Sequence, residues 1–170
     1  MPHLPTPSQT VGPFFSFALC KGPDADLVEP GSDDVIALYG RVLDGAGAGV
    51  PDALVELWQP DGDGRYRSDF GWGRSGTDSG GGYGFTTVRP GAPPGQAPCF
   101  TLLVFARGLL KPVLTRAYLG DAEEANAADP VLAALAPADR ATLLAEPLAG
   151  DYRFDVRLQG AQQTVFFAHP

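Results

Sequence analysis

The sequence predicts an all-β sandwich that forms a single domain over residues 1–170. Short segments rich in β-branched and aromatic side chains recur along the chain, and such side chains suit a pleated surface. The 22 glycines and 17 prolines gather largely between these segments, where turns are needed. Only one region, near residues 123–145, has leucine spacings typical of helices. Strands with many turns and little helix are typical of a sandwich.

Composition excludes several classes of protein. A chain of 170 residues is long enough for one buried core. The formal net charge of −8 leaves no basic face for nucleic acid. No apolar run approaches the roughly 20 residues of a membrane span, and the N-terminus lacks the pattern of a signal peptide. Cys20 and Cys99 are too few for a disulfide framework, so we expect reduced thiols and a cytoplasmic protein.

Residues 1–34 predict an extended, proline-rich arm that precedes the sandwich of residues 35–170. Prolines at positions 2, 5, 7 and 13 exclude a long helix at the start. Phe14, Phe15 and Phe17 are nevertheless too apolar for a free tail. The arm therefore needs a surface to lie on, either on this molecule or on a partner.

The sandwich begins after the arm. The predicted strands are residues 35–43, 53–59, 83–88, 100–107, 114–119, 152–158 and 164–167. Pro130 and Pro137 suggest two short helices near residues 123–145. Between residues 59 and 83, a long loop carries Tyr66, Phe70 and Trp72. Rings and charges on a loop between two strands suggest a scaffold that presents a site.

The residues by themselves offer little catalytic chemistry. Asp61-Gly62-Asp63-Gly64 resembles the start of a calcium loop, but Arg65 and Trp72 stand where further oxygen ligands would be needed, so a turn is favoured. His3 and His169 lie at the chain ends, which does not favour a nucleophilic triad. Two histidines and two cysteines, none clustered, do not form a predicted metal site.

An ordered set of motifs resembles the intradiol ring-cleaving dioxygenases over almost the whole chain. The motifs are Thr6–Phe15 (TPSQTVGPFF), Val55–Gln59 (VELWQ), Gly71–Arg74 (GWGR), Thr77-Asp78, Gly82–Gly91 (GYGFTTVRPG), Val104–Gly108 (VFARG), Tyr152–Asp155 (YRFD) and Thr164–Phe167 (TVFF). Single pieces are also found in transthyretin-like sandwiches, whereas the ordered set is specific. The resemblance implies a transthyretin-like/intradiol-dioxygenase β-sandwich.

The resemblance also implies which residues stand at the iron-ligand positions. Catalytic chains of this family hold Fe(III) with two tyrosinates and two histidines, and anionic oxygen suits that hard ion. Tyr66 matches the first tyrosine, and Pro93 stands at the second. Cys99 and Thr101 stand at the His-x-His pair, and Gln96 replaces an arginine three residues before it. The resemblance thus implies no metal bound by this chain, with Tyr66, Pro93, Cys99 and Thr101 as relic positions.

The implied role is that of an alpha-type subunit which pairs with an iron-bearing beta subunit of the same fold. The implied reaction is oxygen-dependent cleavage of protocatechuate to 3-carboxy-cis,cis-muconate at the interface between the two chains, with no catalytic residue in this chain alone. In that setting Thr10, Gly12 and Pro13 of the arm are expected to line the substrate pocket. Arg107 is the expected cation for the aromatic carboxylate, and Arg116 is the second choice.

Other interpretations stay open at this point. Tyr66 also suits a loop or interface tyrosine, Cys99 a small core residue, and Arg107 a surface ion pair. A complete enzyme could use Tyr66 with unrelated carboxylates as iron ligands, although the missing ligands argue against it. A non-enzymatic, transthyretin-like carrier is the third alternative. It gives no reason for the N-terminal arm.

Overall fold

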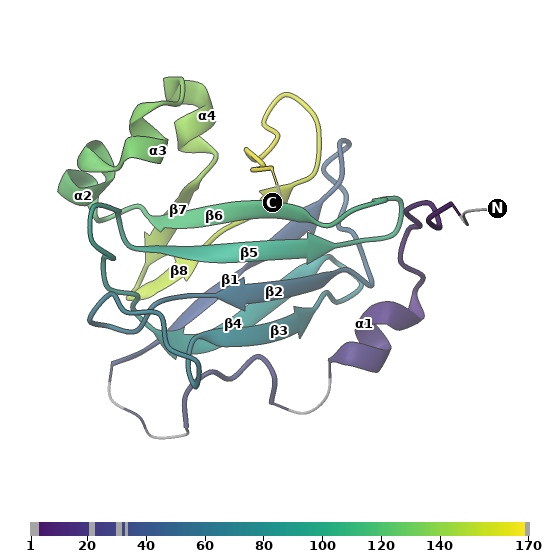
Figure 1. The fold of residues 1–170 in the computed structure, drawn as a ribbon, viewed down its shortest axis with the longest axis horizontal. Coiled ribbons are helices and arrows are strands. Elements are labelled where there is room, and N and C mark those ends of the chain that lie inside the picture. Colours follow the sequence, from purple (N-terminus) through teal and green to yellow (C-terminus); the bar gives the residue numbers. More distant parts are fainter. Residues whose placement is uncertain (1–3, 21–22, 30–31, 33, 169–170) are drawn as a thin grey trace.

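Two layers of strands face one another in the computed structural model, which describes residues 4–20, 23–29, 32 and 34–168 (Figure 1). The strands are β1 Val35–Leu43, β2 Leu54–Trp58, β3 Trp72–Gly76, β4 Gly82–Val88, β5 Cys99–Phe105, β6 Val113–Leu119, β7 Leu144–Leu148, β8 Asp151–Arg153 and β9 Val156–Arg157. Their order is β3-β2-β5-β6-β7-β8-β1-β4, and β9 pairs with β1. The predicted all-β sandwich is confirmed.

The front layer of Figure 1 consists of β3, β2, β5 and β6, which pair antiparallel. The back layer consists of β4, β1 and β8, and β1 runs parallel to β8. Strand β7 joins the layers, because it pairs with β6 on one side and with β8 on the other. Chain segments far apart in the sequence therefore lie side by side in the back layer.

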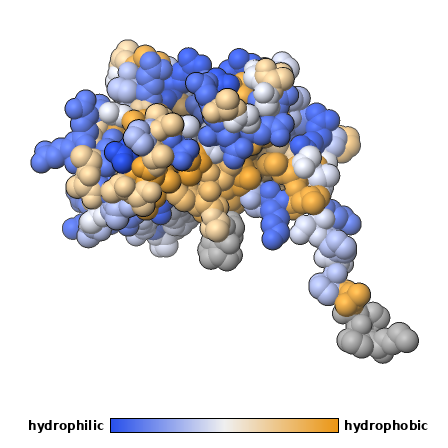
Figure 2. Space-filling model, turned by 90° about the horizontal axis from the view of Figure 1, so that it is seen from above, coloured by the Kyte–Doolittle hydropathy of each residue, from blue (hydrophilic) through white to orange (hydrophobic). Residues whose placement is uncertain are grey.

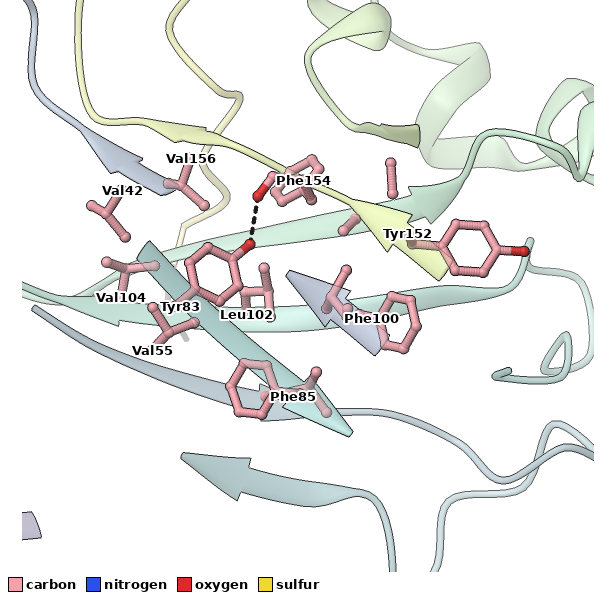
Figure 3. Close-up of a cluster of buried hydrophobic side chains, with 14 of the residues drawn as sticks. Val42, Val55, Tyr83, Phe85, Phe100, Leu102, Val104, Tyr152, Phe154 and Val156 are labelled. Carbon is pink, nitrogen blue, oxygen red and sulfur yellow. Dashed lines mark hydrogen bonds between the residues drawn. The ribbon is translucent and has the colours of Figure 1, made fainter. Parts of the chain in front are cut away.

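The main core lies between the layers (Figure 3). Alternate residues of each strand point inward, as period-two alternation requires. The buried side chains drawn in Figure 3 include Val42, Val55, Tyr83, Phe85, Phe100, Leu102, Val104, Tyr152, Phe154 and Val156. The Tyr83 hydroxyl donates a 2.6 Å hydrogen bond to the Phe154 carbonyl, which ties β4 to the segment between β8 and β9.

Three short helices, rather than the two expected, follow β6: α2 Glu123–Ala128, α3 Pro130–Ala133 and α4 Pro137–Ala141. Pro130 and Pro137 each stand in the first turn of a helix, where a missing N–H costs nothing. The prolines therefore begin helices instead of dividing one long segment. A second apolar cluster, which includes Leu132 and Leu143, holds this region against β5 and β6.

The N-terminal arm is not extended throughout, because it contains the six-residue helix α1 Phe14–Leu19. Ahead of this helix the chain projects from the body (Figure 2). Phe15 packs on Phe105 of β5 with ring centroids 5.3 Å apart, whereas Phe14 and Phe17 are 76% and 81% exposed. Within the described part of the chain, no helix combines the length and apolarity that crossing a membrane requires.

Some strand boundaries differ from the prediction. Strands β3 and β7 fall in segments where no strand is expected, and the predicted strand 152–158 is divided into β8 and β9. Residues 164–167, predicted as a strand, form only an isolated bridge between Phe167 and Leu114. The two histidines, His3 and His169, lie outside the described residues.

Candidate functional site

The outward face of the front layer is covered at both ends and open in the middle. At one end, Leu54 is fully buried where α1 lies against the sheet. At the other end, Tyr118 is fully buried by the second apolar cluster. The middle, here called the open strip, is half-buried or exposed and consists of Glu56, Trp58, Trp72, Arg74, Thr101, Leu103, Leu114 and Arg116.

The four positions that the resemblance assigns to iron ligands lie at one end of this strip, and we call them the Tyr66 cluster (Tyr66, Pro93, Cys99 and Thr101). The Tyr66 ring stacks on Trp58 with centroids 6.3 Å apart and an interplanar angle of 19°. Trp58 is the cross-strand partner of Thr101, two residues beyond Cys99 on the same face of β5. Pro93 is buried in the loop that contacts the turn at Gly64.

The local turn that delivers Tyr66 explains the Asp61-Gly62-Asp63-Gly64 sequence. The Asp61 carboxylate accepts hydrogen bonds from the backbone N–H groups of Asp63 and Arg65 at 3.1 and 2.9 Å. Gly64 has φ +80°, and a side chain there would collide with the Ala92 carbonyl. This carboxylate is therefore engaged in a turn, as the sequence analysis favours over a calcium loop.

The side chains of the Tyr66 cluster do not form a ligand set for a ferric ion. Burial raises the pKa of Tyr66, with Cys99 adding to the shift and Thr101 and Arg116 opposing it. Burial also raises the pKa of the Cys99 thiol to about 11. The four positions that the resemblance assigns to iron ligands thus offer one phenol, one proline, one thiol and one hydroxyl. A set with one phenol and no histidine does not fit Fe(III), for which the resemblance implies two tyrosinates and two histidines.

Arg116 and Tyr118 complete this end of the strip. Cross-strand pairing places Arg116 beside Thr101 and Tyr118 beside Cys99. The Arg116 guanidinium donates to the Tyr118 hydroxyl at 3.3 Å and lies 5.7 Å from the Phe167 ring centroid. Tyr118 is not among the residues predicted for the site, although its place opposite Cys99 follows once β5 and β6 are paired antiparallel. Arg116 is predicted only as a second-choice cation.

The other predicted site residues lie at the opposite end of β5. The Thr10 hydroxyl accepts a 2.7 Å hydrogen bond from the backbone N–H of Gly108, next to Arg107. Gly12 accepts a turn hydrogen bond from Phe15, and Pro13 precedes α1 as its N-cap residue.

Arg107 pairs with Asp52 at 3.2 Å, and both side chains are about half exposed. The structure thus brings Thr10 next to the Arg107–Gly108 turn. Thr10 and this turn lie at the other end of β5 from Thr101. Six residues separate positions 101 and 107, which is on the order of 20 Å at about 3.3 Å per residue.

Gly12 is not required by the described part of the chain. A Cβ atom built on Gly12 would meet no atom of the described residues within 4 Å, and the residue is not among those with positive φ. Thr10, Gly12 and Pro13 are all exposed. The arm therefore presents exposed residues at which the core of this molecule does not determine the side chain.

Comparisons with known proteins agree with these features. The dioxygenase family model matches residues 18–108. The protocatechuate 3,4-dioxygenase alpha chain of Burkholderia cepacia is 41% identical over 189 aligned positions, covering 95% of this chain and 96% of the relative. The beta chain from the same organism is 41% identical over 71 positions, covering 35% of this chain and 30% of the relative.

Among solved structures, the dioxygenase domain of a dioxygenase and carbohydrate-binding protein fusion from Streptomyces sp. SirexAA-E superposes with a TM-score of 0.63 and 26% identity. The match covers 92% of this chain and 99% of that domain. The near-complete coverage by an alpha-chain relative, the family model and the sandwich all lead to the same assignment. This chain belongs to the intradiol dioxygenase family, as a homologue of protocatechuate 3,4-dioxygenase alpha chains.

Proposed function

We propose that this chain is an alpha-type subunit that pairs with an iron-bearing beta chain, and that the pair opens the ring of protocatechuate with O₂ to give 3-carboxy-cis,cis-muconate. The family is iron-dependent, and in this proposal the beta chain holds the Fe(III). The alpha-chain relative, which matches end to end, supports the role. The partial match to a beta chain supports a partner of related fold.

One observation carries the proposal: the two sets of functional residues occupy different ends of β5. The Tyr66 cluster stands at the ligand positions but lacks the donors for iron. Thr10, Gly12 and Pro13 are ready to contact something outside this chain, since they are exposed. An arm that reaches a neighbour's site, combined with a ligand set that cannot hold iron, fits a supporting subunit.

In this proposal the open strip contacts the beta chain. Trp58 and Trp72 are 40% and 45% exposed on neighbouring strands, and aromatic side chains are enriched at protein interfaces. The Glu56–Arg74 ion pair, 2.7 Å long, lies between them and the arm, and the Arg74 guanidinium covers the Trp72 ring. A flat, ring-rich sheet face with one satisfied ion pair suits contact with a similar sheet.

The arm residues shape the pocket in which the substrate is held. Thr10 is fixed to the turn after β5, so its position relative to Arg107 is set. Arg107 supplies a cation for the substrate carboxylate, which replaces the half-exposed Asp52 carboxylate as the ion-pair partner of Arg107. Gly12 leaves room for close approach of the partner or the substrate. A cytoplasmic location belongs to the same proposal, and the free thiols Cys20 and Cys99 support it.

The test compares the chain purified alone with the chain co-expressed with its beta-type partner. Iron content, visible absorption and protocatechuate-dependent oxygen uptake are measured for both. We expect a colourless, inactive chain alone and a coloured, active complex. Iron bound by the isolated chain in an amount equal to that in the complex would refute the proposal and favour the rearranged metal site.

Deleting residues 1–12 separates the proposal from the carrier alternative, because α1 and its contact with Phe105 remain. The proposal expects the truncated chain to fold normally and the complex to lose activity. Full activity after truncation would contradict a pocket-lining role for the arm.

Arg107→Gln tests whether Arg107 is the cation for the substrate, and Arg67→Gln, at an exposed arginine, is the matched control. The Michaelis constant for protocatechuate should rise for Arg107→Gln and stay unchanged for Arg67→Gln.

A further inference from the structure

Arg116 is one of four arginines of the described chain that have no carboxylate within 4.0 Å. Of the other three, Arg41 and Arg140 donate to backbone carbonyls, and Arg157 lies on β9 in the other layer. Six other arginines lie within 4.0 Å of a carboxylate. Arg116, by contrast, is half-buried on the open strip and has no carboxylate within this distance in the described part of the molecule. Its contacts are the Tyr118 hydroxyl and the Phe167 ring.

The side chains nearest Arg116 do not neutralise it. Burial raises the pKa of Tyr118 to about 12 and that of Cys99 to about 11, so both are uncharged near neutral pH. Thr101, directly across the strand pair, is a neutral hydroxyl. The Asp129 carboxylate, whose charge acts on Cys99 and Tyr118, is not an ion-pair partner of Arg116 and accepts from three backbone N–H groups, those of Ala97, Val131 and Leu132.

Covering the open strip would bury this charge completely. A guanidinium has five N–H donors and cannot lose its proton, so it cannot escape burial by becoming neutral. A buried cation without an anionic partner is strongly unfavourable, whereas a hydrogen-bonded carboxylate compensates much of the cost. The surface that covers the strip must therefore bring acceptors to Arg116, and a carboxylate matches the guanidinium fork best.

We propose that Arg116 is the charged anchor of the interface with the beta chain, and that the beta chain places an aspartate or glutamate carboxylate against its guanidinium. This inference rests on the proposed function, since the beta chain is the occupant of the strip. The rings of Trp58, Tyr66 and Phe167 flank the anchor and exclude water from it. Arg116, together with the adjoining Tyr66 cluster, is thereby a recognition site for a protein carboxylate.

The test measures the dissociation constant of the complex between this chain and its beta-type partner. Arg116→Gln removes the charge but keeps a hydrogen-bonding side chain, and Arg116→Glu reverses the charge. Arg157→Gln is the matched control, because Arg157 is half-buried on β9 in the other layer and has no ion pair among the described residues. Thermal unfolding of each isolated variant shows that the fold is retained.

We expect Arg116→Gln to weaken association about 100-fold or more, Arg116→Glu to weaken it further, and Arg157→Gln to leave it unchanged. Replacing one acidic residue of the beta chain by arginine should restore binding to the Arg116→Glu chain. Unchanged affinity of both Arg116 variants would overturn the inference alone. Failure of the unmodified chain to bind the beta chain would refute the proposed function as well.

A free anion is the alternative source of the carboxylate. Dialysed proteins are titrated with and without benzoate as the probe. The inference expects the same affinity in both conditions. An affinity that depends on added benzoate would overturn it, because the carboxylate would then come from solution rather than from the beta chain.

Discussion

Replacing Asp129 by asparagine should loosen the loop that carries the Tyr66 cluster. Asp129 is 1% exposed, and its carboxylate joins two separate segments. One oxygen caps α3 by accepting from Val131 and Leu132 at 2.9 and 3.1 Å, and the other accepts from Ala97 at 2.9 Å. Ala97 lies in the loop between Pro93 and Cys99, so this carboxylate holds that loop against the helices.

The magnitude follows from these three hydrogen bonds. An asparagine has one acceptor oxygen, so its NH₂ group must face at least one of the N–H donors. Leaving a buried donor without an acceptor costs about 1–3 kcal/mol, and the remaining bonds lose their charge assistance. We expect Asp129→Asn to reduce the free energy of unfolding by about 3 kcal/mol. For a chain of this length that lowers the melting temperature by roughly 6–12 °C.

Urea unfolding followed by circular dichroism measures this change. Asp139→Asn is the control, because Asp139 is also an acidic residue near a helix start but is exposed. The control should change the free energy of unfolding by no more than about 0.5 kcal/mol. Equal stability of the two variants would refute the assigned role of Asp129.

Three further results are expected. Gly12→Val should leave the thermal stability of the isolated chain unchanged, since the added side chain meets open space, but should lower oxygen uptake by the complex; unaltered uptake would exclude close contact at this point. Tyr83→Phe should lower the free energy of unfolding by about 1–3 kcal/mol in urea titrations, because the buried Phe154 carbonyl loses its donor.

The third concerns Cys99, whose pKa of about 11 lies above the ordinary value of 9.0. The unfolded chain ionises first, so this thiol's contribution to stability is lost as pH rises from 9 to 11, by up to about 1.4 kcal/mol per pH unit. Cys99→Ala should remove this part of the slope, and identical slopes would argue against the shift.

The sequence predicted the strands whose side chains alternate or form continuous apolar runs. Strand β1 was predicted with the observed bounds, and β5 and β6 within two residues. Strand β3 was not predicted because its sequence, Trp72–Gly76, is rich in glycine. The structure supplies the reason: a side chain at Gly73 would clash with Asp24 and Leu27. Glycine is therefore needed at position 73 because the segment with Asp24 and Leu27 lies close to the strand. The local sequence gives no sign of that contact.

The division between β8 and β9 has a similarly non-local cause. Both strands pair with β1 in one register, since Leu38 faces Tyr152 and Val42 faces Val156. Between them, the Asp155 side chain takes the hydrogen bond from the Arg41 N–H that a backbone carbonyl would otherwise accept. The alternation of apolar and polar residues cannot predict that a side chain takes the place of a backbone carbonyl as hydrogen-bond acceptor.

For the site, single residues were easier to predict than their grouping. The resemblance supplied the members of the Tyr66 cluster and of the arm, and the structure shows that they lie at opposite ends of β5. The sequence gives no reason to single out Arg116, because an arginine within a strand carries no signal of whether a carboxylate lies beside it. That information exists only once every neighbouring strand and loop is in place.

The parallel pairing of β1 with β8 constrains the order in which this chain can acquire its structure. Residues 114 positions apart must meet before the back layer is complete, as the bond between Ala37 and the Asp151 carboxylate illustrates. During synthesis, one edge of β1 therefore stays unpaired until β8 and β9 have been made and have left the ribosome. Contacts of such long range slow folding and prolong exposure of apolar strands. A chain truncated before β8 would keep that edge open permanently, and the expected outcome is aggregation rather than a shortened fold.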